Sequence, residues 1–467
     1  MIEVTCPIDG ARLARVDEAT HADVDAALDA AVAAQRAWAQ TSPTDRGRLL
    51  ARVGDLLREH VEEIAELETS NTGKLLVDTR REARRAADTF TYYAGWADKV
   101  HGDTIPVPGA FHTYTERVPY GVAVGIIPWN VPYFFAAKKI APALAFGNAA
   151  ICKPAPETPL TALRLGELLT EAGIPEGLVH ILIGGADVGA ALVEDARTDV
   201  VVFTGHHETG RVIARDAGTQ LTPVTLELGG KSPQLVFDDA DLDAAVDGIV
   251  LGVFATCGQM CIAGSRLLVQ DRIHDELLAR LATRTEALNV GDPRTPGTDL
   301  GPQITAAQRT KTLELLEQGR SQGRVLAQAR LPDDPRLQHG NFVPPTVLGE
   351  LDPSSPVVRE EVFGPLLTVA TFRDEDDAVA QANDTEFGLA AGVWSRDVGR
   401  AHRVARRLDV GNVWINTYRI LSDLVPFGGR GSSGFGRENA DEAMRLYTTV
   451  RSVWTAMDAG MPASFRR

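Results

Sequence analysis

Short apolar runs alternate with helical segments from Val118 onward, and this alternation constrains the fold more than any other feature. The first series comprises VAVGII, NAAICK, LVHILIG, DVVVFTG, VTLELGG and PQLVF. A second series comprises SRLLVQ, LLTVATF, AAGVWS and GNVWIN. Strands separated by helices form parallel βαβ units, which bind ligands beyond the carboxyl ends of their strands. The sequence therefore predicts an α/β fold with two Rossmann-like domains.

The first hundred residues have the pattern of amphipathic helices. THADVDAALDAAVAAQRAW opens with Thr20 and Asp23 at capping-box spacing, and Ser42 before Pro43 marks the start of SPTDRGRLLARVGDLLREHVEEIAELE. The whole chain has 467 residues, more than the roughly 250 to 300 residues at which one core stops growing. We therefore expect at least two large domains.

The charge and hydropathy pattern excludes several classes of partner. A formal net charge of -16 disfavours nucleic acid and anionic membranes, because both bind positive patches. The N-terminus lacks the basic and apolar segments of a secretory signal, and no apolar run approaches the roughly 20 residues that span a bilayer. We expect a cytoplasmic protein without nucleic-acid or membrane partners.

The segment FATCGQMCIAGSR holds two of the four cysteines, Cys257 and Cys261. The pair could be half of a metal site, a disulfide, or a catalytic thiol beside an inert one. No second Cys or His pair follows at a zinc-finger interval, and a reducing compartment disfavours disulfides, so we expect no metal. Cys257 continues the helix-like segment DLDAAVDGIVLGVFATCG and is expected to be buried, whereas Cys261 lies in a loop.

Four further motifs have both a structural and a functional interpretation. Glu227 ends the apolar strand of VTLELGGKSP and could be a base or a solvated carboxylate. Asn130 in IIPWNVP could donate to an oxyanion or only make a turn. FTGHHETGR could place a phosphate at a helix N-terminus, and Glu361 and Phe363 in EEVFGP could hold a ribose and a planar ring.

The order PWN, KPAPETP, FTG, ELGGKSP, QMCIAGSR, EEVFGP, PFGG and SGFGRE resembles the aldehyde dehydrogenase superfamily. The resemblance extends from about Pro7 to about Trp454. It implies a cofactor-binding domain (residues 1–100 and 119–229) and a catalytic domain (230–430). It also implies a small β oligomerisation arm (101–118 and 440–456), so we expect a homodimer or homotetramer.

The resemblance implies roles for three residues. Cys261 would attack the aldehyde, Asn130 and the backbone N–H of Cys261 would stabilise the oxyanion, and Glu227 would activate water to hydrolyse the thioester. The expected activity is NAD(P)-dependent oxidation of a small aldehyde to its carboxylic acid. Two alternatives are a CoA-acylating dehydrogenase, against which Glu227 argues, and a non-catalytic protein with the same fold.

The resemblance also implies a cofactor site for NAD, with NADP possible because Pro156 replaces the glutamate that binds the adenosine ribose in many relatives. The expected cofactor contacts are Ile126, Pro128, Trp129, Lys153, Pro156, Gly205, His206, Leu228, Glu361 and Phe363. His206 and His207 replace small hydroxylated residues of relatives, and His206 would cap a helix. Lys139 matches a family lysine near the active site.

The substrate pocket is expected to include Val131, Lys138 and Arg419. Lys138 lies where relatives have an aromatic residue lining the tunnel, and Arg419 lies on a loop near its mouth. Two cations there would suit an aldehyde that carries a carboxylate, such as a semialdehyde. Two solvated surface cations are the alternative.

Overall fold

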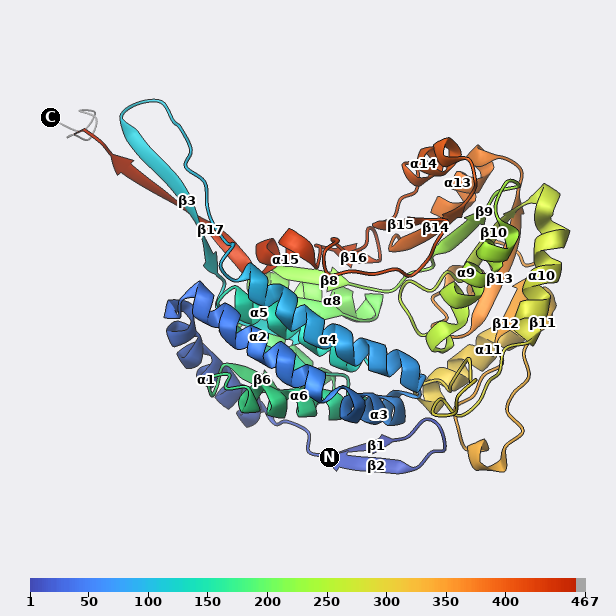
Figure 1. Ribbon diagram of the computed structural model, residues 1–467, viewed down its shortest axis with the longest axis horizontal. Helices are drawn as coiled ribbons and strands as arrows, with labels where there is room; N and C mark the ends of the chain where they lie inside the picture. The colour runs from blue at the N-terminus through green and yellow to red at the C-terminus, as the bar shows by residue number, and fades with distance from the viewer. Residues whose placement is uncertain (459–467) are drawn as a thin grey trace.

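Two mostly parallel β-sheets organise the residues that this computed structural model describes, 1–458 (Figure 1). The first sheet has the order β16 (Gly434–Phe435), β8 (Val224–Glu227), β7 (Val200–Thr204), β4 (Val122–Ile126), β5 (Ala149–Lys153) and β6 (Val179–Ile181). The second has the order β11 (Arg324–Gln328), β12 (Thr346–Gly349), β13 (Leu366–Phe372), β10 (Arg266–Gln270), β9 (Pro233–Val236), β14 (Ala390–Trp394) and β15 (Asn412–Ile415). The predicted α/β class is confirmed.

Helices cover the first sheet, whose strands β4, β5 and β7 are buried along their whole length. These helices are α1 (His21–Gln40), α2 (Pro43–Glu59), α3 (Val61–Thr72), α4 (Leu76–Trp96), α5 (Pro132–Ala145), α6 (Leu160–Glu171), α7 (Ala186–Glu194) and α8 (His207–Thr219). Thr20 and Asp23 form the expected capping box of α1. The continuous pattern after Ser42 is two helices, because His60 leaves the helical conformation at φ -100° and ψ 12°.

The N-terminal segment differs from the helical expectation. β1 (Ile2–Thr5) and β2 (Arg12–Val16) form an antiparallel hairpin before α1. The turn between them includes Gly10 at φ +77°, a conformation that favours glycine.

Alternate residues of the second sheet face two separate layers of helices. Leu267 and Val269 of β10 pack in one core with α9 (Leu242–Phe254) and α10 (His274–Glu286), whereas Leu268 packs in another with α13 (Glu375–Asn383) and α14 (Val398–Ala405). The helices α11 (Ala306–Gln322) and α12 (Pro356–Arg359) cover β12 on the latter side. PQLVF, which ends the first apolar series, is β9 in the middle of this sheet.

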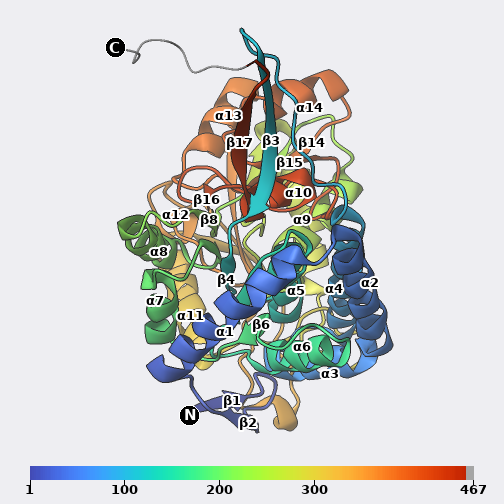
Figure 2. The ribbon, with the colours of Figure 1, turned by 90° about the vertical axis from the view of Figure 1, so that its left-hand side faces the viewer.

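A two-stranded ribbon projects from the first domain (Figures 1 and 2). It pairs β3 (Phe111–Pro119) with β17 (Thr448–Ala456) in antiparallel register, and α15 (Ala440–Tyr447) leads into β17. The two segments expected to form the β oligomerisation arm therefore pair with each other through β3 and β17. No helix within residues 1–458 is long and apolar enough to cross a bilayer.

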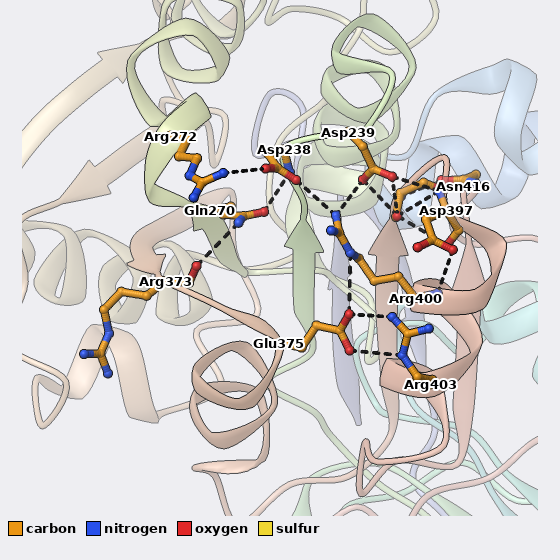
Figure 3. Close-up of polar contacts among 11 residues, drawn as sticks. Asp238, Asp239, Gln270, Arg272, Arg373, Glu375, Asp397, Arg400, Arg403 and Asn416 are labelled. Carbon is orange, nitrogen blue, oxygen red and sulfur yellow. Dashed lines mark hydrogen bonds and ion pairs between the residues drawn. The ribbon is translucent and has the colours of Figure 1, made fainter.

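The carboxyl edge of the second sheet carries a network of charged side chains (Figure 3). Arg400 lies 3.0 Å from a carboxylate oxygen of Asp238 and 3.1 Å from one of Asp239. Glu375 joins Arg400 to Arg403, with 2.7 Å between Glu375 Oε1 and the Arg403 guanidinium. The polar groups at this edge are thus paired within the sheet's own connections.

Candidate active site

One cavity of about 170 Å³ collects most of the sequence-predicted site residues. The first sheet contributes segments that follow its strands: Pro128 to Asn130 after β4, Thr204 to His206 after β7, and Glu227 to Gly229 around the end of β8. The second domain contributes Cys261 before β10 and Glu361 and Phe363 before β13. The carboxyl edge of one sheet therefore faces the amino edge of the other across the cavity.

The loop that carries Cys261 begins with a strained turn. Helix α9 ends at Phe254, and Thr256 and Cys257 then have φ of +58° and +54°. Left-handed backbone costs a residue with a side chain of the order of 1–3 kcal/mol, a strain found at functional sites. The helix-like segment predicted to reach Gly258 is thus four residues shorter, because the chain must turn sharply toward the cavity.

Gly258 continues this turn at φ +71°, and a Cβ there would lie only 2.2 Å from the carbonyl oxygen of Gly364. The turn therefore packs directly against the loop that carries Glu361 and Phe363. Residue 258 must be glycine for this approach.

The two cysteines of the loop differ in position. Cys261 lines the cavity and is half-buried, whereas Cys257 is buried away from it. All four cysteines are free thiols. Burial, and then the carboxylates of Glu361 and Glu227, raise the pKa of the Cys261 thiol to about 12, and burial alone raises the pKa of Cys257 to about 12. The two thiols therefore differ in their access to the cavity and not in their pKa, and only Cys261 can contact a ligand there.

Asn130 is held over the same loop. Its Nδ2 donates to the carbonyl oxygen of Gln259 at 2.8 Å and lies 3.8 Å from the sulfur of Met260. An amide nitrogen carries two N–H donors, and beyond the Gln259 carbonyl the only acceptor among residues 1–458 is the Met260 sulfur, a weak acceptor that a ligand oxygen could replace. The Pro128 and Pro132 that flank Asn130 in sequence restrict the loop that presents it.

Glu227 is buried at the end of β8, and neither carboxylate oxygen has a hydrogen-bond partner among residues 1–458. Burial and the nearby Glu438 raise the pKa of Glu227 well above its ordinary value. An unpaired buried carboxyl is costly and is characteristic of a functional site. Its elevated pKa makes the carboxylate a stronger base than a solvated glutamate.

Lys138 and Lys139 of α5 both contact Glu438, which follows β16. Lys138 Nζ lies 2.7 Å from Glu438 Oε2, and Lys139 pairs with Oε1 and also donates to Thr204 Oγ1 at 2.8 Å. Lys138 is buried, so its description as a solvated surface cation is wrong.

Arg419 is the second cation of the expected substrate pocket, and it is not free in solvent either. Its guanidinium donates to the carbonyl oxygens of Leu251 and Ala255 at 3.1 and 3.3 Å. Arg419 therefore ties its own loop to the end of α9. Neither Arg419 nor Lys138 is among the residues that line the cavity, and Val131 is buried at the N-cap of α5.

The opposite end of the cavity has the features of a nucleotide site. The rings of Trp129 and Phe363 meet edge to face with centroids 5.2 Å apart. Glu361 Oε1 accepts a hydrogen bond from the backbone of Gly230 at 3.0 Å, and burial raises the pKa of Glu361 to about 7. Apolar rings beside a carboxylate can hold a planar base and its ribose hydroxyls.

His206 caps helix α8 by accepting the Glu208 N–H at Nδ1, 3.3 Å away, and its ring lies 4.2 Å from that of His207. Burial, and then the charges of His207 and Lys311, lower the pKa of His206. His206, His207 and Glu361 also offer three ligand atoms within 4.8 Å of one another, a group that could hold a metal ion. Two of these residues already accept hydrogen bonds from the backbone.

Three of the expected cofactor residues lie outside the cavity: Ile126, Lys153 and Pro156. Ile126 and Lys153 are register partners at the ends of β4 and β5. Lys153 Nζ donates to the carbonyl oxygens of Gly184 and Pro154 at 2.7 and 3.1 Å. Ile126 and Lys153 therefore lie side by side at the carboxyl edge of the first sheet, outside the cavity.

Gln308 and Lys311 of α11 line the cavity and were not anticipated from the sequence. Gln308 Nε2 donates to the carbonyl oxygens of Val362 and Phe363 at 3.0 Å, and Lys311 Nζ donates to that of Glu361 at 3.2 Å. Their spacing of three on one helix face was the available signal. It is too common in solvated helices to indicate a site.

Comparisons with known proteins agree with this geometry. The family model "Aldehyde dehydrogenase family" matches residues 1–453. Betaine aldehyde dehydrogenase 1 of Rhizobium meliloti (strain 1021) is 44% identical over 460 residues, which are 98% of this chain and 94% of that protein.

Two solved structures superpose with a TM-score of 0.97. A putative aldehyde dehydrogenase from Burkholderia cenocepacia is 43% identical, with 100% of this chain and 96% of that chain covered. Betaine aldehyde dehydrogenase from Staphylococcus aureus, solved in complex with NAD+, is 36% identical, with 100% and 93% covered.

Proposed function

The chain belongs to the aldehyde dehydrogenase family, and from this premise we propose that it oxidises an aldehyde to the carboxylic acid with NAD as acceptor. The observation that carries the proposal is one cavity lined by a thiol, an amide, an unpaired carboxyl and a nucleotide-like end. Cys261, Asn130 and Glu227 supply the first three, and Glu361 and Phe363 belong to the fourth.

Cys261 is the proposed nucleophile. Its sulfur forms a bond to the carbonyl carbon of the aldehyde, and the carbonyl oxygen takes the negative charge. The second N–H of Asn130 and the backbone N–H of Cys261 stabilise that oxygen, and each such donor is typically worth about 10²- to 10³-fold in rate. Because the pKa of Cys261 is about 12, a base must accept the thiol proton, and Glu227 lines the same cavity.

The residues that line the cavity suit a nicotinamide nucleotide. A Cβ on Gly229 would lie 2.0 Å from Glu361 Oε2, so a side chain there would displace that carboxylate. Glu361 would hold ribose hydroxyls, the rings of Trp129 and Phe363 would flank the base, and Gly205 would lie beneath the phosphates at the N-terminus of α8. When bound, NAD would supply a positive charge and the acceptor for the hydride whose loss converts the Cys261 adduct into a thioester. Lys153 and Pro156 would hold the adenosine end, where the chain has no glutamate to exclude NADP.

Glu227 is the proposed base for hydrolysis. It removes a proton from water as the water oxygen attacks the thioester carbon, and the C–S bond breaks to return the Cys261 sulfur. A carboxyl with a raised pKa suits this role. The presence of a base that can activate water argues against CoA as the acyl acceptor. Product analysis with and without CoA decides this point: we expect the free acid at the same rate in both, and acyl-CoA formation would contradict hydrolysis.

A carboxylated aldehyde is one candidate substrate, supported by the positive charge of Lys138 near Cys261. The pairing of Lys138 with Glu438 leaves that charge partly compensated, and the relatives named for betaine aldehyde provide a cationic second candidate. A panel of neutral, carboxylated and quaternary ammonium aldehydes of matched length, assayed with NAD and NADP, tests both. Equal kcat/KM for neutral and carboxylated members would remove the support for a semialdehyde.

A further inference from the structure

Two consecutive lysines share one buried carboxylate. Lys138 and Lys139 bind the two oxygens of Glu438, and all three side chains are at most 8% exposed. One cation would balance one carboxylate, and an uncompensated buried charge is unfavourable unless it has a further partner. When both lysines are protonated, the second one leaves a surplus positive charge in this cluster, and burial, opposed by Glu438 and reinforced by Lys138, lowers the pKa of Lys139.

Shared neighbours connect the cluster to Cys261 and Glu227. Phe427 packs in the same apolar cluster as Cys261, and its ring lies 5.1 Å from Lys138 Nζ. A Cβ on Gly428, the next residue, would be 2.6 Å from Glu227 Oε1. On the other side, Thr204 bonds Lys139 and is the register partner of Glu227 in β7 and β8. Phe427 is thus a neighbour of both Lys138 and the Cys261 cluster, and Thr204 is a neighbour of both Lys139 and Glu227.

The charges that act most strongly on Cys261 are the carboxylates of Glu361 and Glu227 and the ammonium of Lys138. The charges of Arg419 and Cys261 also interact, but the Arg419 guanidinium donates its hydrogen bonds to backbone carbonyls. The charges that act on Glu227 are those of Glu438, Lys138, Lys139 and Arg437. Those that act on Lys138 are the charges of Glu438, Glu227 and Asp423. Lys138 is therefore the cation that opposes two carboxylates at the thiol.

We infer that Lys138 is a positioning residue for the reaction: it binds Oε2 of Glu438 and keeps a net positive charge near Cys261 and Glu227. This charge favours the ionised forms of the thiol and the carboxyl, and so opposes the rise in pKa that burial causes at both groups. The inference deepens the proposed function, on which its catalytic meaning rests.

The test measures how the reactivity of the Cys261 thiol depends on pH, and it does not measure turnover. Full-length protein without cofactor is alkylated with iodoacetamide between pH 6 and 10, and modification of the Cys261 peptide is followed by mass spectrometry. Lys138 lowers the pKa of Cys261, so K138Q should raise it and leave less thiolate at a given pH. We expect alkylation to slow by roughly three- to tenfold, since one pKa unit changes the thiolate fraction about tenfold.

Three further variants decide the interpretation. K138R should retain the wild-type profile, and K99Q, which removes an exposed lysine, should also do so. E438Q should move the profile to lower pH, because it removes the carboxylate that both lysines neutralise. E438Q also keeps the inference testable if K138Q does not fold.

An unshifted K138Q profile, equal shifts in K138Q and K138R, or an E438Q shift to higher pH would each overturn the inference. Failure of the proposed function has a different signature. If an alanine at position 261 left turnover intact, the nucleophile assignment would fail, whereas the charge effect on alkylation would stand.

Discussion

The two edges of the second sheet adjoin polar side chains of the same kinds in opposite states. At the carboxyl edge, Asp238 and Asp239 share Arg400 (Figure 3). Beyond the amino edge, Glu227 faces Cys261 with both of its oxygens unpartnered among residues 1–458. Paired charges stabilise a fold, whereas unpaired buried groups are available to a ligand. The comparison predicts that changes at the first edge alter stability and changes at the second alter chemistry.

Replacing the cavity thiol tests the comparison most severely. C261A should abolish NADH formation, a loss of at least about 10³-fold, because no other described thiol lines the cavity. C257A is the matched control and should retain most activity, since Cys257 is buried outside the cavity. Steady-state absorbance of the reduced nicotinamide measures both. The reverse result would transfer the nucleophile to position 257.

Removing the unpaired carboxylate should have the next largest effect. E227Q should lower steady-state turnover by roughly 10²- to 10⁴-fold, the usual contribution of a general base. Cofactor affinity should remain within about twofold. The accumulated acyl-enzyme, detected by mass spectrometry, distinguishes slow hydrolysis from slow attack. Turnover at the wild-type rate would require another base.

The cofactor end of the cavity should respond in affinity. E361Q loses the charge that would pair with ribose hydroxyls, and we expect NAD binding to weaken by about tenfold, the scale of one charge-assisted hydrogen bond. Titration of tryptophan fluorescence with NAD measures this, since Trp129 lies beside Phe363. Unchanged affinity would place the nucleotide elsewhere. Iodoacetamide alkylation of Cys261 should continue in this variant.

We expect the smallest effect on kcat from changes at the carboxyl edge of the second sheet, where the charged side chains are paired. R400Q removes contacts with Asp238, Asp239 and Glu375, and should lower the free energy of unfolding by about 1–2 kcal/mol, a value reduced by solvent at a side chain that is 25% exposed. kcat per folded enzyme should not change. R373Q, at an arginine 79% exposed on the same edge, should be nearly neutral. Urea unfolding at pH 7 separates the two, and a large loss of kcat in R400Q would contradict the comparison.

Local patterns predicted much of this architecture. Apolar runs such as VAVGII and AAGVWS became the buried strands β4 and β14, because strands covered on both faces need continuous apolar sequence. The capping pair at Thr20 fixed the start of α1. Motif order then indicated the family and singled out Cys261, Glu227 and Asn130, which line one cavity.

Features set by distant contacts could not be predicted. The pairing of Lys138 with Glu438 joins residues 300 positions apart, and no local pattern distinguishes it from a solvated lysine. The left-handed turn at Thr256 and Cys257 could not be predicted, because neither residue prefers that conformation and the next residue, Gly258, packs against the distant Gly364. Propensity likewise overlooked the hairpin before α1, whose strands are only four and five residues long.

The order in which the chain is synthesised gives the late strand β16 a particular consequence. The first sheet is complete only when β16 pairs with β8, and Gly434 is the register partner of Glu227. The second domain leaves the ribosome before this strand does, so it can fold while the first sheet still has an open edge at Glu227, the proposed base. Glu438 arrives with the same segment. Pairing of β16 therefore completes the sheet beside Glu227, and a nascent chain halted before β16 would carry Cys261 but lack both β16 and Glu438.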